Sequence, residues 1–216
     1  MTSEQPQLLI VEDNADVQTY LKNILAGQYQ LAFAKNGKMG LEKAQESIPD
    51  IILSDVMMPE LDGFELTKRL KTDERTSHIP IILLTARADT ASKLEGLEYG
   101  ADAYLIKPFD KQELFIRLRK LLELRQKLQA RYQSLQPPTK ATSKAVQQED
   151  AFLQKLREVV ENNISDEHFR IPEVCKAMGV SRTQLHRKLK ALTGRSTSQV
   201  INSIRLQRAK HLLATT

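Results

Sequence analysis

The sequence predicts a doubly wound α/β domain with a five-stranded parallel sheet, followed by a smaller all-α domain. In the first half, short apolar runs alternate with amphipathic stretches. A stretch with paired prolines and no apolar periodicity, SLQPPTKATSKAVQQED, then interrupts this pattern. Beyond it, every segment has the apolar spacing of a helix. A length of 216 residues suits two domains of these sizes.

The five predicted strands contain apolar runs that end in polar residues. In chain order they are LLIVED (8–13), YQLAFAK (29–35), DIILSDV (50–56), IPIILLTA (79–86) and AYLIKPF (103–109). The third and fourth lack the alternation of a half-exposed strand, so helices should cover both of their faces.

Five amphipathic stretches provide those helices. They are VQTYLKNILAG (17–27), GLEKAQESI (40–48), GFELTKRLKTD (63–73), TASKLEGLEYG (90–100) and KQELFIRLRKLLELRQKL (111–128). Right-handed crossovers place the carboxyl ends of all the strands along one edge, where such folds carry their chemistry.

The predicted domain boundaries follow from this order. Residues 1–125 form the first domain, with its last helix extending to about 133, residues 134–149 form a linker, and residues 150–216 form the second domain. In the second domain, a first helix starts with Asp150 as its N-cap. A second helix begins near Pro172 and ends at Gly179, and a third is capped by Ser181 and stops at Gly194.

Composition excludes several classes of protein. No apolar run approaches the roughly 18 to 20 residues of a membrane span, and the start MTSEQPQ lacks the pattern of a secretory signal, so we expect a cytoplasmic protein. The single cysteine, Cys175, cannot form an internal disulfide and is expected to be a small buried hydrophobe. The four histidines show no metal-ligand spacing.

Charge differs between the two halves. Residues 1–125 carry 16 Lys and Arg against 20 Asp and Glu, a net charge of −4, whereas residues 126–216 carry 16 against 7, a net charge of +9. An acidic half can hold a divalent cation, and a basic half suggests a polyanionic partner. Two ordinary solvated surfaces are the alternative.

Polar residues at four strand ends predict a reactive site. Glu12 and Asp13 follow the first strand, Asp55 ends the third, Thr85 ends the fourth, and Lys107 follows the fifth. Three carboxylates at one edge repel one another unless a cation joins them, and hard oxygen ligands suit Mg²⁺.

Such a site can transfer a phosphoryl group. With Mg²⁺ and the Lys107 ammonium neutralising the phosphoryl oxygens, Asp55 can attack phosphorus and form an acyl phosphate. The Thr85 hydroxyl can donate a hydrogen bond to the same oxygens. Each residue alone has a simpler explanation, such as a solvated strand end, a helix cap or a surface lysine, but their joint occurrence favours the site.

Four motifs resemble those of receiver domains of two-component response regulators, whose fold is flavodoxin-like. They are VEDN (11–14), SDVMMPELDG (54–63), LLTA (83–86) and YLIKPF (104–109), and the resemblance covers residues 6–125. It implies that Asp55 is the phospho-acceptor, that Thr85 and Tyr104 form the switch, and that the Met57 backbone carbonyl joins Glu12, Asp13 and Asp55 around Mg²⁺.

The basic half contains a helix, a tight turn and a second helix in the segment FRIPEVCKAMGVSRTQLHRKLKALTG. The exposed face of its second helix is expected to present Arg182, Thr183, His186, Arg187 and Lys190. These side chains suit duplex DNA, because arginine can pair with guanine and lysine with phosphate. Basic amphipathic helices also bind acidic proteins or are simply solvated, so both alternatives stay open.

The segment SRTQLHRKLKALTGRSTSQVINSIRLQRAKHLL resembles the first helix-turn-helix and connecting helix of AraC-type regulators, over residues 148–213. The resemblance implies that Arg182, Thr183, His186 and Arg187 meet base edges. It places Ser181, Lys188 and Lys190 at phosphates or solvent. Core positions on the long helix are then Leu206, Ala209, Leu212 and Leu213.

The chain departs from the AraC pattern because no second helix-turn-helix follows the long helix. Three alternatives are open: the chain is truncated, single motifs pair in a dimer, or tight DNA binding has been lost.

These observations predict a phosphorylation-controlled transcription factor. A sensor histidine kinase phosphorylates Asp55, the chain forms a homodimer, and two reading helices meet adjacent half-sites on double-stranded DNA. The alternative is a phosphorelay or protein-interaction module, or the end of a hybrid sensor kinase, although the initial methionine and short lead before Leu8 argue against the last. In each case the chain is no metabolic enzyme, and its chemistry is limited to self-phosphorylation and slow acyl-phosphate hydrolysis.

Overall fold

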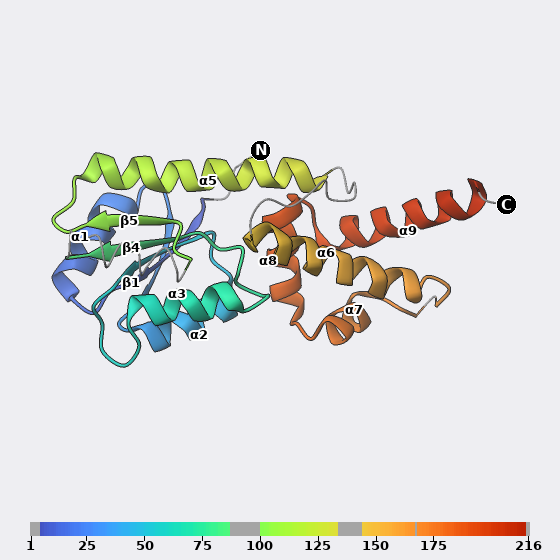
Figure 1. The fold of residues 1–216 in the computed structure, drawn as a ribbon, viewed down its shortest axis with the longest axis horizontal. Helices are drawn as coiled ribbons and strands as arrows, with labels where there is room; N and C mark the ends of the chain where they lie inside the picture. The colour runs from blue at the N-terminus through green and yellow to red at the C-terminus, as the bar shows by residue number, and fades with distance from the viewer. Residues whose placement is uncertain (1–4, 87–99, 134–143, 167, 215–216) are drawn as a thin grey trace. The chain divides into compact units, whose positions relative to one another are not determined.

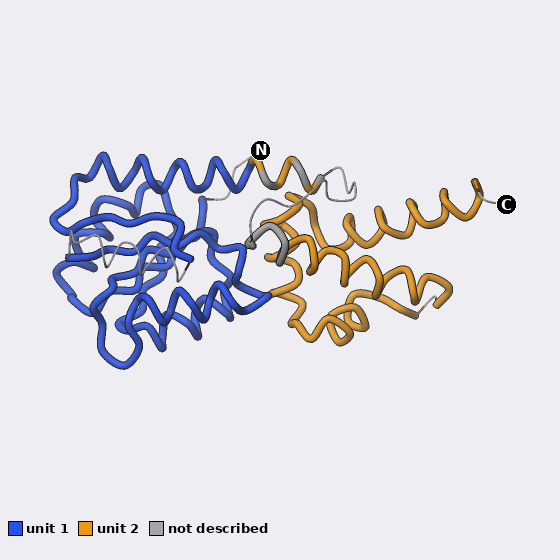
Figure 2. Tube along the Cα trace, viewed as in Figure 1, with its two compact units in different colours: residues 1–126 blue, residues 127–216 orange. Residues whose placement is uncertain are grey.

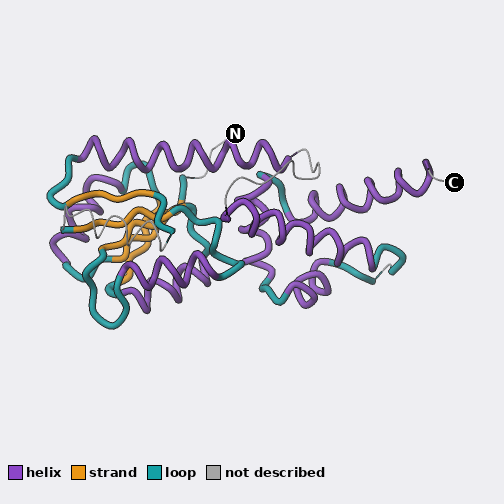
Figure 3. The backbone as a smooth tube through the Cα atoms, in the orientation of Figure 1, coloured by secondary structure: helices purple, strands orange, loops and turns teal. Residues whose placement is uncertain are grey.

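The computed structural model describes residues 5–86, 100–133, 144–166 and 168–214. Its contacts divide the chain into two compact units, Met1–Gln126 and Lys127–Thr216 (Figure 2). Within the described residues, strands occur only in the first unit, and the second is built from helices (Figure 3). The division falls inside helix α5 (Lys111–Gln133), which therefore contributes residues to both units.

The first unit contains the predicted five-stranded parallel sheet (Figure 1). Its strands are β1 (Gln7–Val11), β2 (Gln30–Ala34), β3 (Ile51–Asp55), β4 (Ile81–Thr85) and β5 (Ala103–Ile106). The strand order β2-β1-β3-β4-β5 confirms the doubly wound, flavodoxin-like arrangement. In the register, Ile10 pairs with Leu53, and Leu53 pairs with Ile82.

Helices cover both faces of the sheet, as the unbroken apolar runs predict. Alternate strand residues point to opposite faces. Leu9, Val11 and Ile52 pack with residues of α2 (Gly37–Ser47) and α3 (Gly63–Thr72). Their neighbours on the opposite face pack with α1 (Ala15–Leu25) and the first turns of α5 (Figure 1). The helix expected at 90–100 lies almost entirely outside the described residues.

Strand β3 is fixed at its start as well as along its sides. All five of its residues are buried. Directly before it, Asp50 accepts a hydrogen bond from the Gln7 N–H at 2.8 Å and pairs with the Arg125 guanidinium at 2.9 Å. The central strand is therefore tied to β1 and to α5 at the end opposite Asp55.

The second unit packs four helices and the last turns of α5 around one core. The four are α6 (Lys144–Asn162), α7 (Ile171–Met178), α8 (Arg182–Thr193) and α9 (Thr197–Ala214). The expectation that the first of them begins at Asp150 is wrong, because α6 begins at Lys144. Residues 144–149 are mostly good helix formers, and none of them stops a helix.

The turn between α7 and α8 follows the sequence prediction. Gly179 ends α7 with a φ of 67°, a conformation that glycine adopts without steric cost. Ser181 caps α8 by accepting the Gln184 N–H at 3.1 Å, and the Gln184 side chain accepts the Ser181 N–H at 2.9 Å. Gly194 ends α8, as expected, and Cys175 is buried.

Two further expectations for this unit are wrong. Lys188, expected at phosphates or solvent, is buried on the core side of α8. The expected core positions near the end of α9 are exposed, namely Leu206, Ala209, Leu212 and Leu213. The helices α6 and α8 pack against α9, and the buried residues of α9 end at Ile204.

None of the described helices combines the length and the apolar character that crossing a membrane would require.

Candidate functional site

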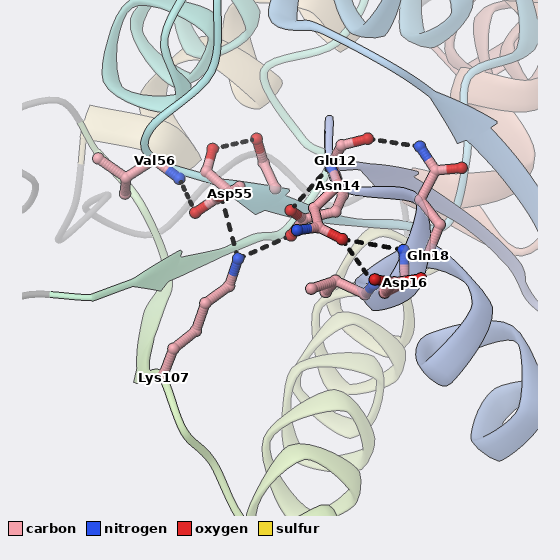
Figure 4. A network of polar contacts seen from close by, with 9 residues as sticks. Glu12, Asn14, Asp16, Gln18, Asp55, Val56 and Lys107 are labelled. Carbon is pink, nitrogen blue, oxygen red and sulfur yellow. Dashed lines mark hydrogen bonds and ion pairs between the residues drawn. The ribbon is translucent and has the colours of Figure 1, made fainter.

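Four of the predicted site residues meet at the carboxyl edge of the sheet, and three of them, Glu12, Asp55 and Lys107, are labelled in Figure 4. Glu12 and Asp13 directly follow β1, Asp55 ends β3, and Lys107 directly follows β5. One carboxylate oxygen from each of Glu12, Asp13 and Asp55 lies within 4.8 Å of the other two. The parallel strand order brings these residues together, because it aligns the ends of β1, β3 and β5 along one edge.

The Lys107 ammonium lies between two of the carboxylates (Figure 4). Its Nζ is 2.8 Å from Glu12 Oε2 and 3.0 Å from Asp55 Oδ2. Burial raises the pKa of Glu12, the hydrogen bond from Lys107 opposes this, and the Asp55 charge raises the pKa further. Burial alone would lower the pKa of Lys107, but its contacts with Glu12 and Asp55 raise it. The ammonium is thus held in its charged form.

The two oxygens of Asp55 have different partners. Oδ1 accepts the backbone N–H of Val56 at 2.8 Å, whereas Oδ2 faces Lys107. The residue is only 7% exposed, and both of its carboxylate oxygens have partners, so the carboxylate is fixed in direction.

A glycine closes the loop behind Asp55. A Cβ on Gly63 would lie 2.2 Å from the Asp55 carbonyl oxygen, so a side chain at this position would displace the backbone. The Gly63 N–H also donates to the Val56 carbonyl at 2.9 Å, which anchors the start of α3 beside the site.

Sequence reasoning missed the residues that hold the Glu12 and Asp13 segment in place. Asn14 caps α1, its Oδ1 accepting the N–H groups of Asp16 at 2.9 Å and Val17 at 3.2 Å (Figure 4). The Gln18 side chain donates to the Glu12 carbonyl. The signal for Asn14 was present, since asparagine directly before an amphipathic run is a typical helix cap.

The two predicted switch residues lie on neighbouring strands. Thr85 ends β4 and is 5% exposed. Tyr104 lies on β5, where burial and the Asp102 charge raise its pKa to about 12. Its hydroxyl oxygen is buried, and no hydrogen-bond partner for it occurs among the described residues.

Met57 follows Asp55 at the edge of the sheet. Its side chain is 68% exposed and gives no structural reason for a role of its own. The predicted contribution of Met57 to Mg²⁺ binding therefore depends on its backbone carbonyl alone.

The five predicted DNA-contacting residues lie on α8 in the second unit. Arg182, Thr183, His186 and Lys190 are exposed, and Arg187 is half-buried. The opposite side of the helix packs into the core through Leu185, Leu189 and Leu192. One face of α8 is therefore polar, basic and accessible within this unit.

The donor set at the sheet edge fits a hard divalent cation. It consists of carboxylate oxygens from three residues, and the Asp55 charge raises the pKa of Glu12, which shows that the carboxylates repel one another. A cation of the Mg²⁺ type would relieve this repulsion. Beside it, the charged Lys107 and the oriented Asp55 carboxylate have the chemistry to receive an anionic electrophile such as a phosphoryl group.

Comparisons with known proteins agree with this chemistry. The family model described as response regulator receiver domain matches residues 8–119. The response regulator ArlR of Staphylococcus saprophyticus is 40% identical over 117 residues, which are 54% of this chain and 52% of that protein. A receiver domain of a sensor histidine kinase from Pseudomonas aeruginosa, solved with a magnesium ion in its active-site cleft, is 31% identical with a TM-score of 0.53, over 56% of this chain and 99% of that one.

One relative matches both units. Histidine kinase P4 of Formosa agariphila is 40% identical over 214 residues, which are 98% of this chain. The matched region is only 16% of that kinase and 52% of ArlR. The chain therefore spans about half or less of the length of these two curated relatives.

Proposed function

Because the chain belongs to the response regulator receiver family over residues 8–119, we propose that Asp55 accepts a phosphoryl group from a histidine kinase and that this modification controls DNA binding by the helical unit. Receiver domains act in two-component signalling, in which histidine kinases phosphorylate them. The observation that carries the proposal is the Lys107 ammonium, 2.8 Å from Glu12 and 3.0 Å from Asp55 at the open edge of the sheet.

The chain's own residues orient the reaction. The Val56 N–H holds one oxygen of Asp55, which leaves the other to attack phosphorus. The new O–P bond forms as the bond from phosphorus to the donor breaks, and the donor atom keeps the electron pair and takes a proton. Lys107 and the Thr85 hydroxyl bind the phosphoryl oxygens. We expect only slow hydrolysis of the acyl phosphate, so the chain is a signalling protein and no metabolic enzyme.

A magnesium ion would be held by the carboxylates of Glu12, Asp13 and Asp55 and the backbone carbonyl of Met57. When bound, it would neutralise the negative charge that develops on the transferred phosphoryl group.

Phosphorylation at Asp55 is testable by intact mass. The full chain is incubated with a small phosphodonor, with and without Mg²⁺. We expect a mass increase of one phosphoryl group that requires Mg²⁺ and is absent in Asp55→Asn. Labelling that survives this substitution would refute the assignment of Asp55.

The proposal for DNA rests on the helical unit. Helix α8 follows a capped turn, exposes Arg182 and His186, and lies in a half of the chain with a net charge of +9. Phosphorylation would reorient Thr85 and Tyr104, favour a homodimer, and bring two copies of α8 to adjacent half-sites. The modification can shift this equilibrium only by its different affinity for the two states.

Fluorescence anisotropy on duplex DNA tests this step. We expect binding that weakens steeply with salt and tightens with Mg²⁺ and beryllofluoride, a mimic of the phosphorylated state. Absence of binding in both states would refute the DNA-binding proposal and favour a protein partner for α8.

A second candidate is that the chain forms part of a hybrid sensor kinase. The match to Histidine kinase P4, which covers both units, favours it. The chemistry at Asp55 would be unchanged, but the kinase domain would be part of the same polypeptide. An antibody against the helical unit distinguishes the two: a cellular band near 24.6 kDa supports a separate regulator, and a band several times larger supports the hybrid kinase.

A further inference from the structure

Helix α8 carries a lysine on its buried side. Lys188 is 2% exposed and lies among Leu185, Leu189 and Leu192, the residues that pack α8 into the core. Burial of an ammonium group is strongly unfavourable unless a partner compensates the charge. A buried lysine therefore needs a partner that compensates its charge, which an aliphatic side chain at the same position would not need.

That environment comes from α6. Lys188 Nζ lies 3.2 Å from Glu149 Oε2, and the two side chains are only 3% and 8% exposed. Nζ also lies 4.2 Å from the centre of the Phe152 ring. Because Glu149 and Phe152 are three residues apart on one helix, they share a face and receive the ammonium together.

The pair opposes the exposed face of α8. Two residues along an α-helix turn the side-chain direction by roughly 200°, so His186 and Lys190, each two residues from Lys188, point to the opposite side. Both are exposed. A rotation of α8 about its axis would move the Lys188 ammonium away from the Glu149 carboxylate and the Phe152 ring. Leucines can repack after such a rotation, whereas separating a buried ion pair is strongly unfavourable.

We propose that the Lys188–Glu149 pair is a positioning device that sets the rotation of α8 about its axis, and so the direction in which its exposed basic face points. This inference rests on the proposed DNA-binding function for its biological role. Lys188 contacts no DNA in this proposal; it acts through the orientation of the residues on the opposite face.

Three sets of variants separate positioning from simple stabilisation. Glu149→Leu with Lys188→Met removes both charges at similar volume, a change that buried ion pairs often tolerate. Glu149→Lys with Lys188→Glu reverses the pair and restores the attraction. Lys155→Met with Glu158→Gln makes comparable changes at exposed positions of the same helix and serves as the control.

The first readout does not depend on DNA. In the full chain with Cys175→Ala, a cysteine is placed by His186→Cys or Arg187→Cys, and its alkylation rate is measured. With the pair intact, position 186 should react faster than position 187, since His186 is exposed and Arg187 half-buried. In the apolar double variant the two rates should become similar, whereas the reversed pair and the control should keep the difference.

The second readout is the affinity for a duplex selected by the unmodified chain from a random library, relative to a scrambled duplex. This ratio should fall about tenfold or more in the apolar double variant, equivalent to about 1.4 kcal/mol, and recover in the reversed pair. If the alkylation difference persists in a cooperatively melting apolar variant, the positioning proposal is wrong. If that variant does not melt cooperatively, the reversed pair decides, and its failure to keep the difference overturns the proposal. If the alkylation rates change as expected but the unmodified chain selects no duplex, the positioning proposal stands and the DNA-binding function fails.

Discussion

Replacement of Lys107 by methionine should destabilise the acidic site, because the carboxylates of Glu12, Asp13 and Asp55 would then repel one another without a neutralising ammonium. The substitution keeps the length of the side chain but removes the ammonium that lies 2.8 Å from Glu12 and 3.0 Å from Asp55. At an effective dielectric constant of about 20, opposite charges about 3 Å apart attract by roughly 5 kcal/mol. Desolvation already offsets part of this attraction, and Lys107 is 23% exposed, so we expect the local free energy of opening to fall by about 2 to 4 kcal/mol at neutral pH.

The stability difference between Lys107→Met and the unmodified chain should depend on pH. Glu12 has a folded-state pKa above its ordinary value of 4.5, and loss of the hydrogen bond from Lys107 should raise that pKa further. A carboxyl with a raised folded pKa stabilises the fold fully below its unfolded pKa, and this contribution is lost as pH rises through the folded pKa. The difference between Lys107→Met and the unmodified chain should therefore grow from acid toward neutral pH. Mg²⁺ should reduce it, because the cation replaces the missing positive charge.

Hydrogen exchange of the full chain measures this effect where it occurs. Peptides from β1 and β3 report the free energy of opening at the site, and peptides from α7 and α8 provide an internal reference. Lys120→Met, an exposed lysine on α5, is the matched control and should change nothing at β3. Equal protection of β3 in Lys107→Met and the unmodified chain at neutral pH without Mg²⁺ would show that the ammonium does not stabilise the carboxylates. A difference that shrinks as pH rises would contradict the pKa argument.

Three further predictions concern single groups. Gly63→Ala should destabilise the first unit by about 2 to 4 kcal/mol in thermal melts and slow phosphoryl labelling of Asp55, because the new Cβ would lie 2.2 Å from a carbonyl oxygen. The control Gly27→Ala, whose Cβ would have nothing within 4 Å, should change stability by less than about 1 kcal/mol. Tyr104→Phe removes a buried hydroxyl that has no hydrogen-bond partner among the described residues. Hydrogen exchange of β5 should therefore show unchanged stability, or stability greater by up to about 1 kcal/mol, and a clear loss would show that the hydroxyl forms a stabilising hydrogen bond. Ser181→Ala should lower the opening free energy of α8 by about 1 kcal/mol and Ser181→Gly by a few tenths, and equal losses in both would argue against a capping role.

The sheet and the residues at its edge were predictable because both depend on local patterns. Unbroken apolar runs in β3 and β4 indicate strands covered on both faces, and a parallel order aligns their carboxyl ends. Polar residues directly after those runs, such as Asp55 and Lys107, must then share an edge. The contacts between them were not predictable, since Lys107 and Glu12 are 95 residues apart and their distance depends on the packed fold.

The errors in the helical unit have a different origin. Lys188 lies three residues after Leu185 and four before Leu192, which is the spacing of a core position, but its charge suggested a surface residue. Its burial depends on partners from another helix, Glu149 and Phe152, whose proximity the spacing on α8 does not reveal. For Leu206 and Leu213, periodicity indicates an apolar face on α9 but does not say which element covers it.

The anchoring of β3 limits how the protein can respond to chemistry at its carboxyl end. The strand is hydrogen-bonded on both sides, buried on both faces, and tied through Asp50 to Arg125 and to the Gln7 amide. A phosphoryl group on Asp55 would add bulk and negative charge at the end of a strand that is held at its start, along both sides and on both faces. We therefore expect any structural response to occur at the edge of the sheet, with β3 as the fixed reference.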